Sequence, residues 1–199
     1  MSQTSAFGSA TLHEAAGQIG ALPSVIKPID PGMRVHGPAF TARSAPRNNL
    51  WLHRALATAA PGDVIVAEVG GWYEAGYWGE IMTVAAQTRE IAGLVLDGCV
   101  RDVEQIASCG FPVFSRGACI RGTSKDPESS GALGEPITLG EVTIHPGDLV
   151  VGDADGVVIV PSVAIDEVLA KARERESNEA EIMNRLRRGE TTLDIYGFR

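Results

Sequence analysis

Cysteines, lysines and long apolar runs are all scarce in this chain, and each shortage excludes a class of protein. The three cysteines, Cys99, Cys109 and Cys119, form no C-x-x-C pair, so neither a disulfide framework nor a zinc ribbon is indicated. No stretch approaches the ~20 apolar residues of a membrane span, and residues 1–5 lack the charged and apolar regions of a secretion signal. We therefore expect a reducing, cytoplasmic location and no contact with a membrane.

Positive charge is scarce as well, with 17 lysines and arginines against 25 acidic residues and a formal net charge of −8. Such a chain repels phosphate backbones unless its cations gather in one place. The one cluster, Arg185, Arg187 and Arg188, closes a predicted helix, where cations complement the helix dipole. We expect no nucleic-acid partner.

Only three of the basic residues are lysines, and their sequence surroundings bear on mechanism. A Schiff-base mechanism needs a lysine in a dry pocket. Lys27 precedes a proline, Lys125 falls in a polar loop and Lys171 falls on a charged stretch of helix. The sequence therefore disfavours lysine catalysis.

What is present is the composition of one compact domain, 1–199, with 44% apolar and 21% charged residues. No repeat, linker or low-complexity tract divides the chain. A chain of this length buries roughly 70% of its unfolded surface, so its core needs no disulfides.

Hydrophobic periodicity predicts an α/β fold. Strands are expected over 33–44, 64–69, 93–96 and 112–114, and helices over 11–19, 49–60, 81–92 and 102–109, with a capping box at 11–14. This alternation is the signature of a layer of parallel strands, whose ligand sites lie beyond the carboxyl ends. Loops are expected over 70–79 and 122–135. Later segments predict an antiparallel meander or small barrel, over 136–139, 142–144, 149–151 and 157–160, and a long C-terminal helix, over 162–188.

The segment Gly79-Glu80-Ile81-Met82 is the first candidate for chemistry. A glycine-rich loop opens a helix here, and the first backbone N–H groups of a helix are unpaired, which makes an anion site. The alternative is a plain helix start with Glu80 at the positive end of the dipole.

The second candidate is the stretch from Asp97 to Asp102, which follows a buried strand. Asp97 could make a turn and Asp102 could cap the next helix. Arg101 is suited to paired contact with a carboxylate or enolate oxygen, and Asp102 offers a hard oxygen ligand to Mg²⁺ or Mn²⁺. Together they predict a Lewis-acid site with its own oxyanion partner.

The last helix carries an apolar stripe that is interrupted by Glu176 and Glu179. Carboxylates in such a stripe must be paired, hydrated or exposed, because unpaired burial costs several kcal/mol. Either the helix projects past its own core around 173–181 and is solvated there, or one of the two glutamates serves the site of a neighbouring subunit.

Histidines and aromatics carry weaker signals. No His-x-x-x-His or His-x-His pair occurs, so structural or surface roles are expected for the histidines, which are His13, His36, His53 and His145. Four aromatics either wall a pocket or pack under their loop, and these are Trp72, Tyr73, Tyr77 and Trp78.

In the order of these motifs along the chain, the sequence resembles the family of 4-hydroxy-4-methyl-2-oxoglutarate/4-carboxy-4-hydroxy-2-oxoadipate aldolases. That family also contains the regulator of ribonuclease activity A. The resemblance covers nearly the whole chain, through segments 11–15, 61–64, 79–80, 97–102, 110–114, 146–148 and 155–158. The aldolase motif of that family is an acidic residue, twenty intervening residues and Arg-Asp, a spacing that Glu80 and Arg101-Asp102 reproduce.

The resemblance implies roles for these residues. Asp102 would bind the divalent metal, Mg²⁺ or Mn²⁺, and Arg101 would hold the keto oxygen of the pyruvyl group and its enolate. The N–H groups from Glu80 to Met82 would bind the pyruvyl carboxylate. Glu80, one methylene longer than the family's usual aspartate, would position or deprotonate a metal-bound water. Glu179 of an adjacent subunit, or Glu176 as the alternative, would approach the metal through water.

The resemblance also implies a swivelling β/β/α fold and trimers or a dimer of trimers with active sites between subunits. The expected function is a metal-dependent aldolase that cleaves 4-hydroxy-2-oxo acids to pyruvate and decarboxylates oxaloacetate. A non-catalytic regulator of a ribonuclease is the competing class, and a hydratase or hydrolase for another oxo acid is a third. Members labelled methyltransferases exist, but no G-x-G-x-x-G follows a strand here.

Overall fold

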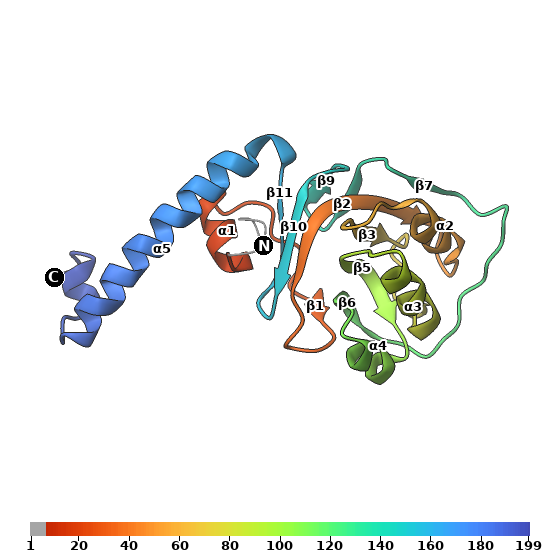
Figure 1. Ribbon diagram of the computed structural model, residues 1–199, viewed down its shortest axis with the longest axis horizontal. Helices are drawn as coiled ribbons and strands as arrows, with labels where there is room; N and C mark the ends of the chain where they lie inside the picture. The colour runs from red at the N-terminus through yellow and green to blue at the C-terminus, as the bar shows by residue number, and fades with distance from the viewer. Residues whose placement is uncertain (1–6) are drawn as a thin grey trace.

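The computed structural model describes residues 7–199, so the segment 1–5, in which no secretion signal was found, lies outside the described residues. Within the described residues, one nine-stranded sheet organises the chain in the order β1-β6-β5-β3-β2-β10-β11, with β4 beside β5 and β7 beside β2 (Figure 1). Its strands are β1 (Lys27–Pro28), β2 (Val35–Ser44), β3 (Val64–Glu68), β4 (Gly76–Trp78), β5 (Gly93–Val100), β6 (Val113–Ala118), β7 (Gly131–Leu133), β10 (Leu149–Asp153) and β11 (Gly156–Val160).

Helices occur along the whole described chain, and a small hairpin stands apart from the main sheet. The helices are α1 (Ser9–Ala15), α2 (Leu50–Thr58), α3 (Glu80–Thr88), α4 (Val103–Cys109), α5 (Ile165–Arg187) and α6 (Thr192–Ile195), with a 3₁₀ turn over Ser162–Ala164. The hairpin pairs β8 (Ile137–Leu139) with β9 (Val142–Ile144).

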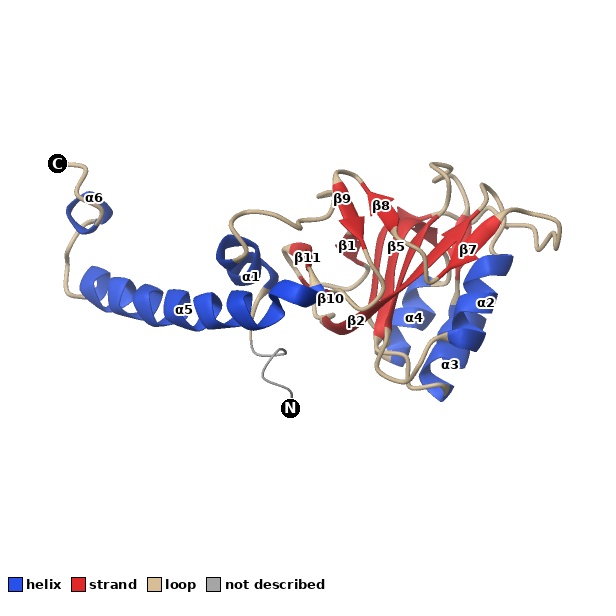
Figure 2. Ribbon diagram, turned by 90° about the horizontal axis from the view of Figure 1, so that it is seen from above, coloured by secondary structure: helices blue, strands red, loops and turns tan. Residues whose placement is uncertain are grey.

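The parallel layer that was expected from sequence is confirmed. Strands β2, β3, β5 and β6 are parallel neighbours, and α2, α3 and α4 lie together on one side of the sheet (Figure 2). The internal strands β3 and β5 are buried along almost their whole length, as apolar parallel strands require. The α/β fold class with a long C-terminal helix is thus confirmed.

The middle of the chain holds more strand than expected. The short strand β4 lies inside the predicted loop 70–79 and pairs with the end of β5. Strand β5 does not end at Asp97 and Gly98 but continues to Val100. Asp97 makes no turn: it is 8% exposed within β5, and its Oδ1 accepts from Arg116 Nε at 2.5 Å. An ion pair with the neighbouring strand therefore explains this carboxylate.

The predicted meander is only partly correct. The hairpin β8–β9 forms, but β10 and β11 join the main sheet, where β10 pairs antiparallel with β2. Strand β7 lies within the predicted loop 122–135. A strand of three residues shows too little alternation to be found by its period.

Helix α1 begins and ends earlier than expected, and the capping box at 11–14 was wrong. Its N-cap is Gly8, and Asp153 fixes the first turn by accepting from the backbone N and the Oγ of Ser9, at 2.7 and 2.6 Å. Burial raises the pKa of Asp153, but these bonds, a further bond from the backbone N–H of Asp155 and the charge of Arg34 together hold the pKa below its ordinary value. Gly17 and Gln18, at φ 81° and 65°, turn the chain away after the helix.

Helix α5 is anchored at its beginning and projects beyond the sheet (Figure 1). Its buried residues Val168, Leu169 and Ala172 pack in a second apolar cluster with α1 and the outer face of β10 and β11. Past Ala172 no residue of α5 is buried within this chain. In the described residues, no helix combines the length and apolar character that a membrane crossing requires.

Candidate active site

A small pocket lies where β4 and β5 end side by side. Its volume is about 180 Å³, and five of the predicted site residues line it, namely Gly79, Ile81, Met82, Arg101 and Asp102. Because β4 and β5 are parallel, their carboxyl ends meet, which brings the start of α3 to the start of α4. Residues about twenty positions apart thus form one site.

Asp102 stands at the centre of this geometry. Its Oδ2 accepts from the backbone N–H of Glu80 at 3.1 Å and lies 3.7 Å from Arg101 Nε. The carboxylate does not cap α4, which removes that alternative, although the residue occupies the N-cap position. Its backbone is left-handed, at φ 58° and ψ 41°, a conformation that costs roughly 1–2 kcal/mol for most side chains and less for Asp or Asn.

The glycines of the loop make room for this pair. A Cβ at position 79 would overlap Asp102 Oδ2, and a Cβ at position 76 would overlap the carbonyl oxygen of Cys119 and lie 3.0 Å from Arg101 Cβ. Gly79 has an extended backbone at φ −155°, so the constraint there is space and not conformation. Bulk at either position would displace Arg101 or Asp102.

The start of α3 forms the part of the pocket where the anion site is predicted. Thr83 is the first residue of this helix whose N–H has a helical acceptor, the carbonyl of Gly79. The N–H of Glu80 is engaged by Asp102, so the groups left for an anion are those of Ile81 and Met82. One of the three predicted donors is therefore occupied by the neighbouring carboxylate.

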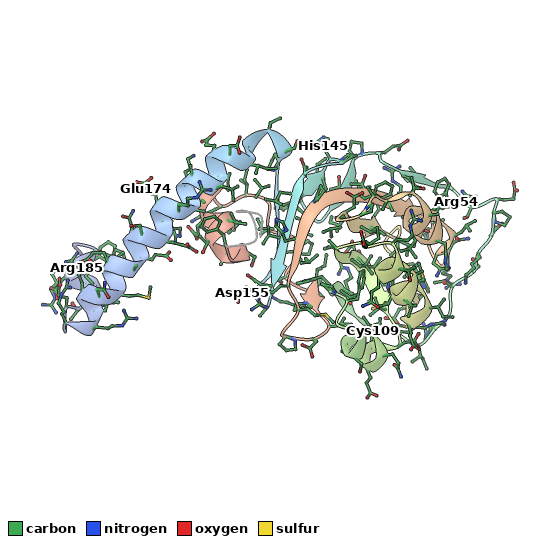
Figure 3. All side chains as sticks on the ribbon, viewed as in Figure 1. Arg54, Cys109, His145, Asp155, Glu174 and Arg185 are labelled. Carbon is green, nitrogen blue, oxygen red and sulfur yellow. The ribbon has the colours of Figure 1, made fainter. Side chains whose placement is uncertain are left out.

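None of the three predicted glutamates lines the pocket. The Glu80 side chain is exposed, and the residue is not among those that line the pocket. Glu179 Oε1 lies 2.9 Å from Arg175 Nε on α5, and Glu176 is exposed on the same helix. Figure 3 places Glu174 on this projecting part of α5, away from Arg54 and Cys109 in the parallel layer. A single chain does not bring these two α5 glutamates to the pocket.

Six lining residues were missed from sequence, and three of them carry side chains of chemical interest: Asn49, His53 and Lys125. The other three are Gly76, Gly122 and Thr123. Asn49 and His53 are four positions apart around the first turn of α2, so they share one face, a spacing that a search for histidine pairs does not detect. Lys125 belongs to the expected polar loop, but that loop reaches the pocket.

Asn49 and His53 both carry buried polar atoms. Asn49 is 5% exposed, and its Nδ2 donates to the Tyr77 carbonyl at 2.9 Å, which fixes the amide. Within residues 7–199, Asn49 Oδ1 and His53 Nε2 have no hydrogen-bond partner. Burial, and then the charge of Lys125, lower the pKa of His53, which favours its neutral form.

Of the four aromatics considered from sequence, Tyr77 and Trp78 line the pocket and also brace its loop, whereas Trp72 and Tyr73 do not line it. Tyr77 and Trp78 are fully buried lining residues. The Tyr77 hydroxyl donates to the Trp72 carbonyl at 2.7 Å, and Trp78 Nε1 donates to Thr83 Oγ1 at 2.9 Å. Burial raises the pKa of Tyr77, so its hydroxyl stays protonated at neutral pH.

The donor set suits a hydrated hard cation. No group of three or more His, Cys, Asp or Glu that could hold a metal occurs in the part of the chain that the structure describes. Zn²⁺ would require such a group, whereas Mg²⁺ keeps several waters and needs one or two carboxylates plus oxygens of its substrate. Asp102 beside the predicted anion site fits that requirement.

Together, the fold and this pocket define an α/β protein with a small pocket at the carboxyl edge of its parallel strands, beside an Arg-Asp pair. A family model described as RraA-like, Aldolase/RraA, matches residues 9–159. The chain therefore belongs to this RraA-like family, and the membership expected from sequence is confirmed.

Relatives of known sequence or structure support this family membership. A protein of Halalkalibacterium halodurans named "Putative 4-hydroxy-4-methyl-2-oxoglutarate aldolase" is 38% identical over 84% of this chain and 79% of its own length. A Pseudomonas syringae protein of known structure is 31% identical, with a TM-score of 0.87 over 99% of this chain and 92% of its own. RraAS2 of Streptomyces coelicolor, described as an unusual member of the RNase ES inhibitor RraA protein family, is 29% identical, with a TM-score of 0.81 over 91% and 93%.

Proposed function

We propose that this protein is a divalent-metal-dependent pyruvate aldolase of the cytoplasm. It cleaves 4-hydroxy-2-oxo acids such as 4-hydroxy-4-methyl-2-oxoglutarate to pyruvate and a second oxo acid, and it also decarboxylates oxaloacetate. The observation that carries the proposal is the meeting of Arg101, Asp102 and the free N–H groups of α3 in one pocket. The name of the Halalkalibacterium relative supports it.

Each group has a role in breaking the bond between C3 and C4. The N–H groups of Ile81 and Met82 bind the substrate carboxylate, and Arg101 holds the 2-oxo oxygen. Mg²⁺ or Mn²⁺ held at Asp102 supplies a Lewis acid to the 2-oxo group. As the 4-hydroxyl loses its proton, the electron pair of the C3–C4 bond moves into the pyruvate enolate, where Arg101 stabilises the charge on oxygen. C3 then takes up a proton.

Glu80 is the proposed base, on the spacing of the family motif. Its side chain is exposed to solvent next to Gly79, so it has access to water from which it can take or relay a proton.

The second candidate function is regulation of a ribonuclease by protein binding. The description of RraAS2 as a member of a ribonuclease-inhibitor family favours it. An acidic protein could dock on a basic segment of such a partner. Binding alone gives no reason for Arg101, Asp102 and the start of α3 to converge on a pocket, which is why we place catalysis first.

Pyruvate release from oxaloacetate, measured with and without a chelator, decides between the two. We expect protein-dependent release that the chelator abolishes and that added Mg²⁺ or Mn²⁺ restores. Because metal ions alone decarboxylate oxaloacetate, the control is the Asp102→Asn protein under the same metal concentration. Equal release from both proteins would favour the regulator.

We further propose a homo-oligomer, a trimer or a dimer of trimers, in which Glu179 or Glu176 of α5 reaches the pocket of an adjacent subunit through water. Ile81 beside the pocket and Ile120 after β6 are 80% and 93% exposed, and α5 projects beyond its own core. Such apolar exposure is typical of contact surfaces. Sedimentation should give three or six copies, and a fully active monomer would contradict the assembly.

A further inference from the structure

A buried hydrogen bond lies next to the start of α3, and the reaction described above uses neither of its side chains. Trp78 Nε1 donates to Thr83 Oγ1 at 2.9 Å, and the two residues are 1% and 0% exposed. The Trp78 ring also stacks on that of Phe111, with the ring centroids 6.2 Å apart. Packing needs only apolar side chains of this size, and two polar atoms that leave water for one hydrogen bond gain little stability. The pair therefore requires a second explanation.

Trp78 connects the two halves of the candidate site. Its carbonyl oxygen accepts from the backbone N–H of Arg101 at 2.8 Å, and its indole reaches α3 through Thr83. Thr83 in turn donates its own N–H to the carbonyl of Gly79 at 3.1 Å. A continuous series of hydrogen bonds therefore runs from Arg101 through Trp78 to the first turn of α3.

Few other contacts fix how this first turn is rotated about the helix axis. Ile81 is 80% exposed, so packing within the chain does not hold it. The N–H of Glu80 meets only the surface-accessible carboxylate of Asp102. Thr83 belongs to the same turn, so a hydrogen bond that holds its side chain also holds the direction of the Ile81 and Met82 N–H groups.

We propose that Trp78 and Thr83 are positioning residues, whose hydrogen bond sets the spacing between Arg101 and the free N–H groups of α3. The inference rests on the proposed function. In a pyruvyl group the carboxylate and the 2-oxo oxygen stand on adjacent carbons, so both must meet their partners at once. A displacement of about 1 Å between such partners can cost ~10²-fold in rate.

Thr83→Val tests this role, because it exchanges the hydroxyl for a methyl group and leaves the indole N–H without its acceptor. We expect kcat/KM for oxaloacetate to fall about 10-fold. The inhibition constant of oxalate should rise by a similar factor, since oxalate also carries its oxygens on adjacent carbons. Thr83→Ser, which keeps the hydroxyl, should stay within about 3-fold of the unaltered protein in both measurements.

Trp78→Phe removes the donor of the same hydrogen bond. If this bond positions the site, Trp78→Phe and Thr83→Val together should lose no more oxalate affinity than the larger of the two single losses. The matched control is Thr88→Val, which removes an exposed hydroxyl from the same helix, where it donates to the carbonyl of Val84 at 2.9 Å. Its kinetics should be unchanged.

A second control separates positioning from a general loss of stability. Ile65→Val trims a fully buried side chain of β3 and should lower the thermal unfolding temperature, as Thr83→Val does. Inhibition of the Ile65→Val protein by oxalate should nevertheless equal that of the unaltered protein.

Three results would overturn the inference: unchanged kinetics in Thr83→Val, an equal loss in Thr83→Ser, or losses that add up in the double variant. In each case, chelator-sensitive pyruvate release by the unaltered protein would leave the proposed function intact. An unaltered protein without such release would refute the proposed function, and the positioning role with it.

Discussion

Asp102→Asn should abolish chelator-sensitive pyruvate release, with a loss of about 10³-fold or more. Asparagine has the same shape, tolerates the left-handed backbone at φ 58° and can still accept from the N–H of Glu80. Only the negative charge that a divalent ion requires is removed. Turnover measured over a range of Mg²⁺ and Mn²⁺ concentrations, with metal binding followed by calorimetry, checks the prediction.

The control for this change is Asp126→Asn, which alters an exposed carboxylate in the loop after β6. Circular dichroism and thermal unfolding should match the unaltered protein for both variants, because Asp102 is surface-accessible and asparagine keeps its contact with the N–H of Glu80. Turnover retained by Asp102→Asn at saturating metal would refute the assignment of this residue as metal ligand.

Arg101→Lys should reduce kcat by roughly 10²-fold, and Arg101→Ala should reduce it at least as much. Lysine keeps the positive charge but loses the planar fork of donors that fits paired oxygens. If the guanidinium acts mainly on charge that develops in the enolate, kcat falls more than KM rises. Steady-state kinetics with oxaloacetate and a 4-hydroxy-2-oxo acid separate the effect on kcat from the effect on KM.

Added guanidinium salt gives a second measure of the same role. It should restore part of the activity of Arg101→Ala, by filling the space of the lost group, and should have no such effect on Asp102→Asn. Arg121→Ala, which removes an exposed arginine paired with Glu74, serves as the unaffected control. A variant of Arg101 that loses less than 10-fold in kcat would show that the guanidinium does not stabilise the enolate.

The parallel layer could be predicted from the sequence because its strands are continuous apolar segments bounded by turns. Segments 64–69 and 93–96 carry this signal, and both form internal strands. The strand β4 could not be predicted, since its three residues lie among glycines and aromatics without any period. Its partner β5 defines it, and that pairing depends on contacts distant in sequence.

The candidate site was predictable where its residues are neighbours in sequence. Arg101 and Asp102 follow a buried strand directly, and Gly79 opens the expected helix before that strand, so each half of the site could be predicted locally. The pairing of β4 with β5, which could not be predicted, brings the two halves together. Asn49 and Lys125 come from segments whose own patterns describe only a helix and a polar loop. Their place in the pocket depends on how α2 and the loop after β6 pack, which no local pattern contains.

The roles given to Glu176 and Glu179 stay predictions for a different reason. In one chain both lie on the projecting half of α5, where Glu179 is half-buried and pairs with Arg175 and where Glu176 is exposed. Their interruption of the apolar stripe is explained by solvation within the single chain. Any catalytic use depends on the surface of a second copy.

The lack of space at position 79 also predicts which residues relatives without this chemistry can carry there. Since the extended backbone there accepts any amino acid, only the carboxylate of Asp102 keeps the position empty of a side chain. A lineage that has given up chemistry is free to fill it. Alanine or serine at this site should therefore accompany the disappearance of the acid in members that only bind other proteins, and a bulky residue beside an intact Arg-Asp pair should be rare.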